Sequence, residues 1–304
     1  MQNSKRPVIS VIAGPNGSGK TTVTRQLLGH DWSAGAEYIN PDEVAIDLFG
    51  GMDREANIKA LNYCRARRED LLESRSSVVF ETVFSGEDKL DYLRRAKEAG
   101  FFIRLFFVCL ESPELNAARV ARRVMAGGHT VPIEKIISRY YKSIQNCVTA
   151  SGIADRIYIY DNSEENKDAR LLFRVSNGYV VKQYAEHLPA WAEDIRLRIN
   201  LKRIDFLLKD YAVAQDVKER LATDGECLLD GKLKPGAEKS AGAFLLLKFS
   251  GVGITAEDPG NPASRQPLKD YIASGVALDL RPVRAEQSRN IKDEPLAKSA
   301  SLHK

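Results

Sequence analysis

Hydrophobic positions in the first 165 residues fall into short continuous runs separated by longer stretches with helical periodicity. The short runs are typical of strands buried on both faces, and they cover residues 7–13, 37–40, 77–82, 101–110 and 156–160. The stretches between them predict helices over residues 20–29, 41–50, 53–75, 86–99, 112–126 and 132–150. Because strands alternate with helices, the pattern predicts an α/β fold with a parallel sheet covered by helices on both faces.

The pattern changes after about residue 165. Residues 169–184 are typical of a hairpin around Ser176-Asn177-Gly178, and residues 188–222 look helical. Beyond them, residues 230–243 and 257–267 have loop composition, interrupted by the apolar runs 243–249 and 275–280. We therefore expect a first domain over residues 1–190 and an accessory C-terminal segment, partly loop-rich, over residues 191–304.

A glycine-rich segment between the first strand and the first helix has the pattern G-x-x-x-x-G-K-T. A strand before it and a helix after it distinguish a phosphate-binding loop from a glycine-rich turn with a coincidental lysine. Glycines let successive backbone N–H groups point at one anion, and the helix N-terminus adds positive potential. The sequence thus predicts a nucleotide site formed by Gly14, Pro15, Asn16, Gly17, Ser18, Gly19, Lys20, Thr21 and Thr22.

Two side chains of this loop have predicted roles in binding ATP and Mg²⁺. Lys20 is placed to reach the β- and γ-phosphates, and the Thr21 hydroxyl can ligate the metal ion.

Two carboxylates follow the predicted strands at the edge where ligands bind in parallel sheets. Asp42 comes after the second strand, where it could take a proton from an attacking hydroxyl, help to hold Mg²⁺, or cap the next helix. Glu81, followed by Thr82, ends the third strand. Its carboxylate could bind substrate hydroxyls, support the metal of an ATPase, or be structural.

Arginines on two consecutive predicted helices are typical of a lid that stabilises charge on a transferring phosphoryl group. Arg119 and Arg123 are four residues apart and share a helix face with each other, and Arg139 lies on the next helix. A solvated basic face is the alternative for this cluster. Between the two helices lies Gly127-Gly128-His129, in which we interpret His129 as a packed or capping residue rather than a catalyst.

Composition is that of an ordinary soluble protein, with 43% hydrophobic and 28% charged residues. The net charge of +4 is too small to indicate a nucleic-acid or membrane partner. Four scattered cysteines indicate free thiols in a reducing compartment, so we expect a cytoplasmic protein.

With these motifs in place, the chain resembles the zeta-toxin family of P-loop kinases. The resemblance covers about residues 6–165 and is carried by residues 12–22 (IAGPNGSGKTT), 39–45 (INPDEVA), 78–86 (VVFETVFSG) and 119–144. It implies a fold like that of nucleoside monophosphate kinases, with a mobile lid, and ATP-dependent phosphorylation of a hydroxyl. Members of the family phosphorylate UDP-N-acetylglucosamine, and a small antitoxin protein restrains them.

The resemblance also implies roles for individual residues. Asp42 would be the general base, and Glu81 with Thr82 would face the sugar. Arg123 and Arg139 would be the lid arginines, with Arg119 as a substitute for either.

Three hypotheses about function follow from the sequence. The first is a kinase for a small-molecule hydroxyl acceptor such as UDP-N-acetylglucosamine or another nucleotide sugar. The second is an ATP-binding regulatory module that hydrolyses slowly and acts through its C-terminal segment. The third, a polynucleotide kinase, is disfavoured because the chain lacks a basic stripe rich in aromatic residues.

Overall fold

A computed structural model describes the chain in two compact units, residues 1–196 and 197–304. The described residues are 6–29, 33, 35–51, 53–125, 131–233, 244–273 and 276–282. The predicted Gly127-Gly128-His129 segment lies outside them. Each unit contains its own β-sheet.

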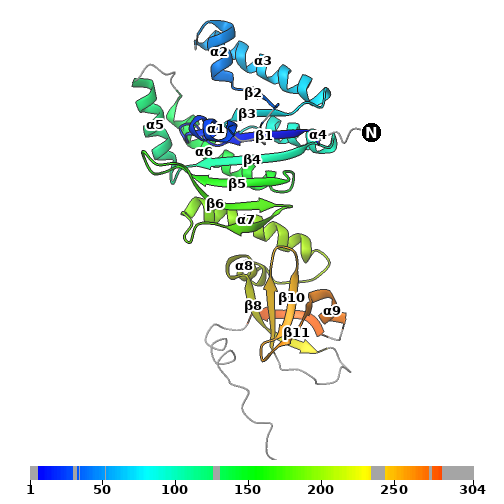
Figure 1. Ribbon diagram of the computed structural model, residues 1–304. Coiled ribbons are helices and arrows are strands. Elements are labelled where there is room, and N and C mark those ends of the chain that lie inside the picture. Colours follow the sequence, from blue (N-terminus) through cyan, green and yellow to red (C-terminus); the bar gives the residue numbers. More distant parts are fainter. Residues whose placement is uncertain are drawn as a thin grey trace, which may run out of the picture. The chain divides into compact units, whose positions relative to one another are not determined.

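The first unit is built on a seven-stranded sheet in the order β2-β3-β1-β4-β5-β6-β7 (Figure 1). Its strands are β1 (Val8–Ala13), β2 (Glu37–Ile39), β3 (Val78–Thr82), β4 (Phe102–Cys109), β5 (Arg156–Asp161), β6 (Arg170–Ser176) and β7 (Tyr179–Gln183). Strands β1 to β5 pair in parallel, as predicted. The predicted hairpin is confirmed as β6 and β7, which extend the same sheet with antiparallel pairing.

The helices of this unit begin and end close to their predicted limits. They are α1 (Lys20–Leu28), α2 (Pro41–Phe49), α3 (Arg54–Glu73), α4 (Glu87–Glu98), α5 (Pro113–Met125), α6 (Ile133–Ala150) and the start of α7 (Ala190–Leu207). No helix in the described ranges is long and apolar enough to cross a membrane.

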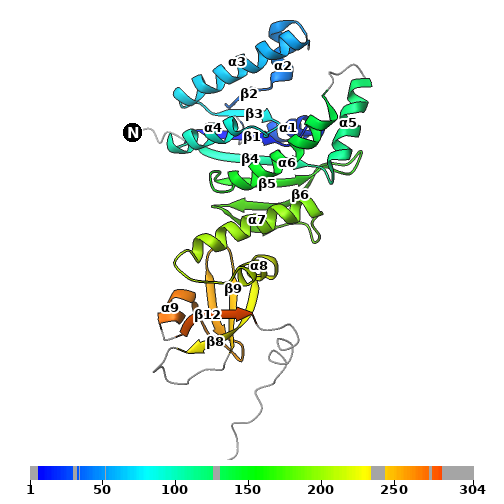
Figure 2. The ribbon, with the colours of Figure 1, turned by 180° about the vertical axis from the view of Figure 1, so that it is seen from behind.

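Helices cover both faces of the sheet, which Figures 1 and 2 show from opposite sides. On one face, Val23 and Leu27 of α1 pack in a cluster with Ile12, Val79 and Phe106. On the other face, the neighbouring positions in these strands turn toward α4, α6 and α7, because side chains alternate along a strand. There Phe80 meets Tyr92 of α4, and Phe107 meets Trp191 of α7.

The second unit is an antiparallel five-stranded sheet in the order β11-β10-β9-β8-β12. Its elements are α8 (Gln215–Asp224), β8 (Glu226–Leu233), β9 (Phe244–Phe249), β10 (Ile254–Asp258), β11 (Asn261–Pro267), α9 (Leu268–Ala273) and β12 (Val276–Pro282). Leu208, Val217, Leu221, Leu247 and Ala256 belong to its buried core.

The helical pattern over residues 188–222 is present as two helices, because the intervening turn lets Leu208 and Val217 enter the same core. One expectation for the C-terminal part was wrong. Residues 257–267, expected to be loop, contain strand β11. The prolines of β11 are compatible with a strand because it lies at the edge of the sheet, where a missing N–H breaks no ladder. Residues 234–243, also expected to be loop, lie outside the described residues.

Trp191 provides a test of where the first unit ends. It is buried and its ring centroid lies 6.4 Å from that of Phe107. We expect Trp191→Ala to lower the free energy of unfolding of the first unit by about 3–5 kcal/mol. A fragment that ends at residue 189 should lose the same packing. Chemical denaturation monitored by nucleotide binding measures the effect.

The control is Phe206→Ala, which removes an aromatic ring from the same helix at a position that is 59% exposed. An equal loss of stability in both variants would show that Trp191 is not part of the first unit's core.

Candidate active site

The loop between β1 and α1 curls at the carboxyl end of the parallel strands. Gly14, Gly17 and Gly19 have φ angles of +151°, +78° and +84°, which residues with side chains rarely adopt. A Cβ atom on Gly14 would lie 2.0 Å from the Val108 carbonyl oxygen, and one on Gly19 would lie 2.2 Å from Asn162 Nδ2. Glycine is therefore required at these two positions for space as well as for conformation.

Two asparagines from distant elements support this curl. Asn116 Nδ2, on α5, donates a hydrogen bond of 2.6 Å to the Asn16 carbonyl. Asn162 Nδ2, just after β5, donates one of 2.9 Å to the Ser18 carbonyl. The sequence analysis missed both residues. The loop is thus held by side chains in a shape that leaves its N–H groups available to an anion.

Lys20 lies at the centre of the site. No side chain caps α1, and its first turn has no acidic residue, so the helix end remains electropositive. Lys20 Nζ donates to the carbonyl oxygens of Gly14 and Pro15 at 2.9 and 3.0 Å. Burial lowers the pKa of Lys20 to about 8, although the carboxylates of Glu81 and Asp42 act in the opposite direction.

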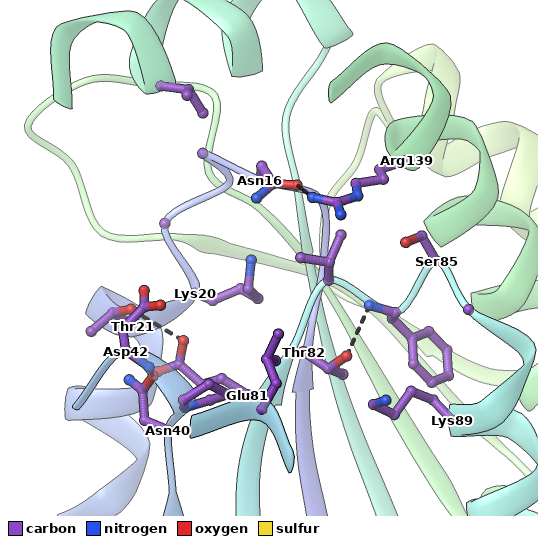
Figure 3. Close-up of a pocket in the computed structure, with 18 of the residues that line it drawn as sticks. Asn16, Lys20, Thr21, Asn40, Asp42, Glu81, Thr82, Ser85, Lys89 and Arg139 are labelled. Atoms are coloured by element: carbon purple, nitrogen blue, oxygen red, sulfur yellow. Dashed lines mark hydrogen bonds between the residues drawn. The ribbon is translucent and has the colours of Figure 1, made fainter. Parts of the chain in front are cut away.

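Glu81 contacts the phosphate-binding loop directly. Thr21 Oγ1 donates a hydrogen bond of 3.1 Å to Glu81 Oε2 (Figure 3). The Tyr38 hydroxyl donates one of 2.8 Å to Glu81 Oε1. The Glu81 side chain is buried and comes from the face of β3 that α1 covers. Glu81 therefore holds the Thr21 hydroxyl, the group that the sequence predicts to ligate Mg²⁺.

Asp42 is one residue inside helix α2, and the capping role belongs to its neighbour. Asn40 Oδ1 accepts a hydrogen bond of 3.0 Å from the Asp42 amide, so Asn40 is the N-cap. No described residue donates a hydrogen bond to the Asp42 carboxylate. The Asp42 side chain is exposed and lines the same cavity as Lys20 and Thr21.

Thr82 lies on the opposite side of β3 from Glu81, since consecutive residues of a strand alternate. Its Oγ1 accepts a hydrogen bond of 3.1 Å from the Phe84 amide, and Phe84 has a φ of +59°. Helix α6 holds the turn: Ser143 Oγ donates to the Val83 carbonyl, and Asn146 Nδ2 donates to the Phe84 carbonyl. The turn is therefore a fixed wall of the cavity.

All three predicted arginines meet at the cavity, whereas Arg122 of the same helix α5 does not. Arg119, Arg123 and Arg139 all line it. Arg139 donates a hydrogen bond of 3.3 Å to Asn16 Oδ1 of the loop, and the charge of Arg123 contributes to the lowered pKa of Lys20. Arg122 instead pairs with Glu165. The structure thus brings the predicted arginines into one cavity with the phosphate-binding loop.

The cavity has a volume of about 760 Å³ and extends beyond the residues that the sequence singled out. Its remaining polar lining comes from α3, from the turn after β3 and from the start of α4, and includes Asn62, Arg65, Arg68, Ser85 and Lys89. Figure 3 shows Ser85 and Lys89 on the far side of Thr82 from Thr21. The site therefore has room for a second ligand beside the nucleotide.

These features define a P-loop nucleotide-binding domain, and sequence comparison agrees. Residues 9–141 match the family described as AAA domain. This match covers the phosphate-binding loop, Asp42, Glu81 and the arginines of α5 and α6.

Three similar proteins match between 42% and 73% of the chain. An uncharacterized protein of Haemophilus influenzae is 28% identical over 127 residues, which are 42% of this chain and 88% of that protein. A chain of the PezAT chromosomal toxin–antitoxin system of Streptococcus pneumoniae is 15% identical, with a TM-score of 0.43 over 73% of this chain and 87% of that one. A chain of the AvrRxo1-ORF1:-ORF2 complex with ATP is 17% identical, with a TM-score of 0.45 over 73% and 77%.

The lowered pKa of Lys20 predicts how nucleotide binding depends on pH. The ammonium form exists below a pH of about 8 and is lost as the pH rises through that value. Because phosphate binding needs the ammonium, metal-free nucleotide affinity should fall above pH 8 by up to about tenfold per pH unit. Titration of a fluorescent nucleotide in EDTA between pH 6.5 and 9.5 measures the effect.

Two variants serve as controls for this pH profile. Lys20→Met should bind more weakly at every pH with no dependence near pH 8. Glu81→Gln removes a charge that raises the pKa of Lys20, so it should move the midpoint to lower pH. A midpoint at the ordinary lysine value in the unmodified protein would contradict the prediction.

Proposed function

We propose that this protein is an ATP-dependent kinase that transfers the γ-phosphoryl group to a hydroxyl of a small molecule. One observation carries the proposal: a phosphate-binding loop, the carboxylate of Asp42 and three arginines line one cavity. In-line phosphoryl transfer needs these groups, because catalysis rests on positioning and charge stabilisation. The cavity extends past Thr82, away from the phosphate-binding loop. This additional space supports an acceptor molecule, rather than water alone, as the second reactant.

The proposed reaction assigns one task to each group. Asp42 takes the proton of the acceptor hydroxyl as its oxygen attacks the γ-phosphorus. The bond between the γ-phosphorus and the bridging oxygen breaks, and ADP leaves with that oxygen. Lys20 neutralises charge on the β- and γ-phosphates. Arg123 and Arg139 stabilise the charge that spreads over the transferring group, and Arg119 assists from the same helix as Arg123.

The residues around Thr21 fit a magnesium ion. The Thr21 hydroxyl, the Glu81 carboxylate 3.1 Å from it and the Asp42 carboxylate are oxygen donors, which Mg²⁺ prefers. We propose that Thr21 ligates the ion and that Glu81 orients the Thr21 hydroxyl. When bound, Mg²⁺ would neutralise phosphate charge.

The resemblance to zeta toxins suggests finer features of this proposal. A nucleotide sugar such as UDP-N-acetylglucosamine is the first acceptor to test. An antitoxin protein is the partner to seek by co-purification, and the cytoplasm is the compartment to examine.

The role of Asp42 is tested by Asp42→Asn. The amide cannot accept the hydroxyl proton, so we expect the rate of transfer to fall about a hundredfold to ten-thousandfold. ATP affinity should change little. Asp47→Asn, an exposed position on the same helix that does not line the cavity, is the matched control. Unaltered turnover in Asp42→Asn would exclude Asp42 as the base.

The reaction class is tested by a screen of ATP consumption with Mg²⁺ against nucleotide sugars, nucleosides, sugar derivatives and small alcohols. Lys20→Ala serves as the blank. We expect at least one acceptor to stimulate ADP formation and to become phosphorylated, as seen by mass spectrometry. Weak hydrolysis that no acceptor stimulates would contradict the kinase proposal and favour a regulatory ATP-binding module.

A further inference from the structure

The guanidinium of Arg68 is the least expected group in the cavity wall. The residue is only 7% exposed, yet it lines the cavity. Its guanidinium carbon lies 5.1 Å from the centre of the Phe80 ring. No described carboxylate lies within ion-pairing distance of it, and no described residue accepts a hydrogen bond from it. Burial lowers the pKa of Arg68, which reflects how poorly its charge is solvated.

A buried charge without a partner is unfavourable, so buried arginines are normally paired with carboxylates. Arg67, the next residue, is more exposed and forms two hydrogen bonds of 2.8 and 2.7 Å with Glu37. Arg68, by contrast, has no anionic acceptor for its five N–H donors within the described protein. A ligand anion in the cavity would supply the missing acceptor.

The neighbours of Arg68 in the cavity wall strengthen its positive charge. Arg65 lies one helical turn away on α3 and also lines the cavity, and Lys89 lines it from the start of α4. Asp88 is the one carboxylate among the described charged residues on this side, and it pairs with Lys89. Three cations thus face one carboxylate, which leaves this part of the cavity net positive.

This cationic cluster lies where a second substrate, rather than the nucleotide, would bind. Figure 3 places Lys89 across Thr82 from Thr21, Asp42 and the phosphate-binding loop. The nucleotide phosphates have their own cradle in that loop. A ligand bound to Arg68 would have its other end near Thr82 and the proposed base.

We propose that Arg68, Arg65 and Lys89 bind an anionic group of the phosphoryl acceptor, so that the acceptor is an alcohol that also carries a phosphate or carboxylate. This inference rests on the proposed function and narrows its substrate class. A guanidinium matches both anions because its planar fork can donate two parallel hydrogen bonds. An uncharged polyol would leave the Arg68 charge without an acceptor and would bind more weakly.

Binding of acceptor analogues to the full chain tests this proposal without turnover. The phosphate-binding loop is first saturated with Mg²⁺ and a non-hydrolysable ATP analogue, so that added anions report on the second site alone. The probes are inorganic phosphate, glucose 6-phosphate, gluconate and UDP-N-acetylglucosamine, with glucose as the uncharged reference. Calorimetry measures the affinity of each probe. The order of these affinities shows whether the site prefers the anionic group of a phosphate monoester, a carboxylate or a nucleotide sugar.

At least one anionic probe should bind more tightly than glucose. Arg68→Met should weaken that binding by about tenfold or more, because it removes the buried partner of the anion. Arg68→Lys should restore part of the affinity. Arg94→Ala, which removes an exposed arginine of α4 that pairs with Glu87 and Asp91, should leave it unchanged.

Arg68 also packs on Phe80, so its variants are checked for folding by thermal denaturation. If Arg68→Met does not fold, Arg65→Ala and Lys89→Met decide the matter, and each should weaken anion binding severalfold. The proposal is overturned if no anionic probe binds better than glucose, or if folded variants of all three residues bind as the parent does.

These outcomes are separable from those of the kinase proposal. Anion binding through Arg68, in a protein that phosphorylates no acceptor of the screen, would support the anion site and contradict the kinase reaction. An uncharged acceptor that Arg68→Met phosphorylates at the parent rate would support the kinase and refute the anion site.

Discussion

The close approach of the phosphate-binding loop to strand β4 is the constraint on which the site depends. The position that a Gly14 side chain would occupy is 2.0 Å from the Val108 carbonyl oxygen, so the backbone itself packs against the end of the neighbouring strand. This contact is possible because β1 and β4 are parallel neighbours whose carboxyl ends meet at one edge. It buries the base of the loop, and burial in turn lowers the pKa of Lys20.

The pleat of β3 divides the cavity into two chemical environments. Glu81 and Thr82 are consecutive, so one points toward α1 and the other toward the opposite face. Glu81 therefore meets Thr21 of the phosphate-binding loop. Thr82 begins the turn that carries Ser85 and leads to Lys89 in the first turn of α4. A single strand end thus separates the side of the cavity at the phosphate-binding loop from the side that we propose for the acceptor.

Much of the first unit could be predicted because its signals are local. Continuous apolar runs identify strands buried on both faces, and the phosphate-binding loop constrains every one of its positions. The asparagines that hold the loop could not be found in this way. Asn116 and Asn162 lie 100 and 144 residues from the carbonyl groups that they contact, and an isolated asparagine carries no pattern. Strand β11 was missed for another reason: its two prolines indicate a loop, unless the strand's edge position is already known.

Helix α3 shows why the proposed acceptor subsite could not be read from the sequence. Arg65, Arg67 and Arg68 lie within four residues of a strongly charged helix, which is typical of a solvated face. The side chains of these three arginines point in different directions because successive residues of a helix project to different sides. Only the packing of α3 beside β3 decides that Arg68 is the one placed over Phe80. A guanidinium buried there without a carboxylate lowers the stability of the fold. The unfavourable burial of Arg68 has a purpose if its charge binds an anionic ligand. A side chain that packing already fixes loses little further conformational freedom when the anion binds. The unfavourable burial of Arg68 and the open, positively charged half of the cavity are then two aspects of one preorganised site.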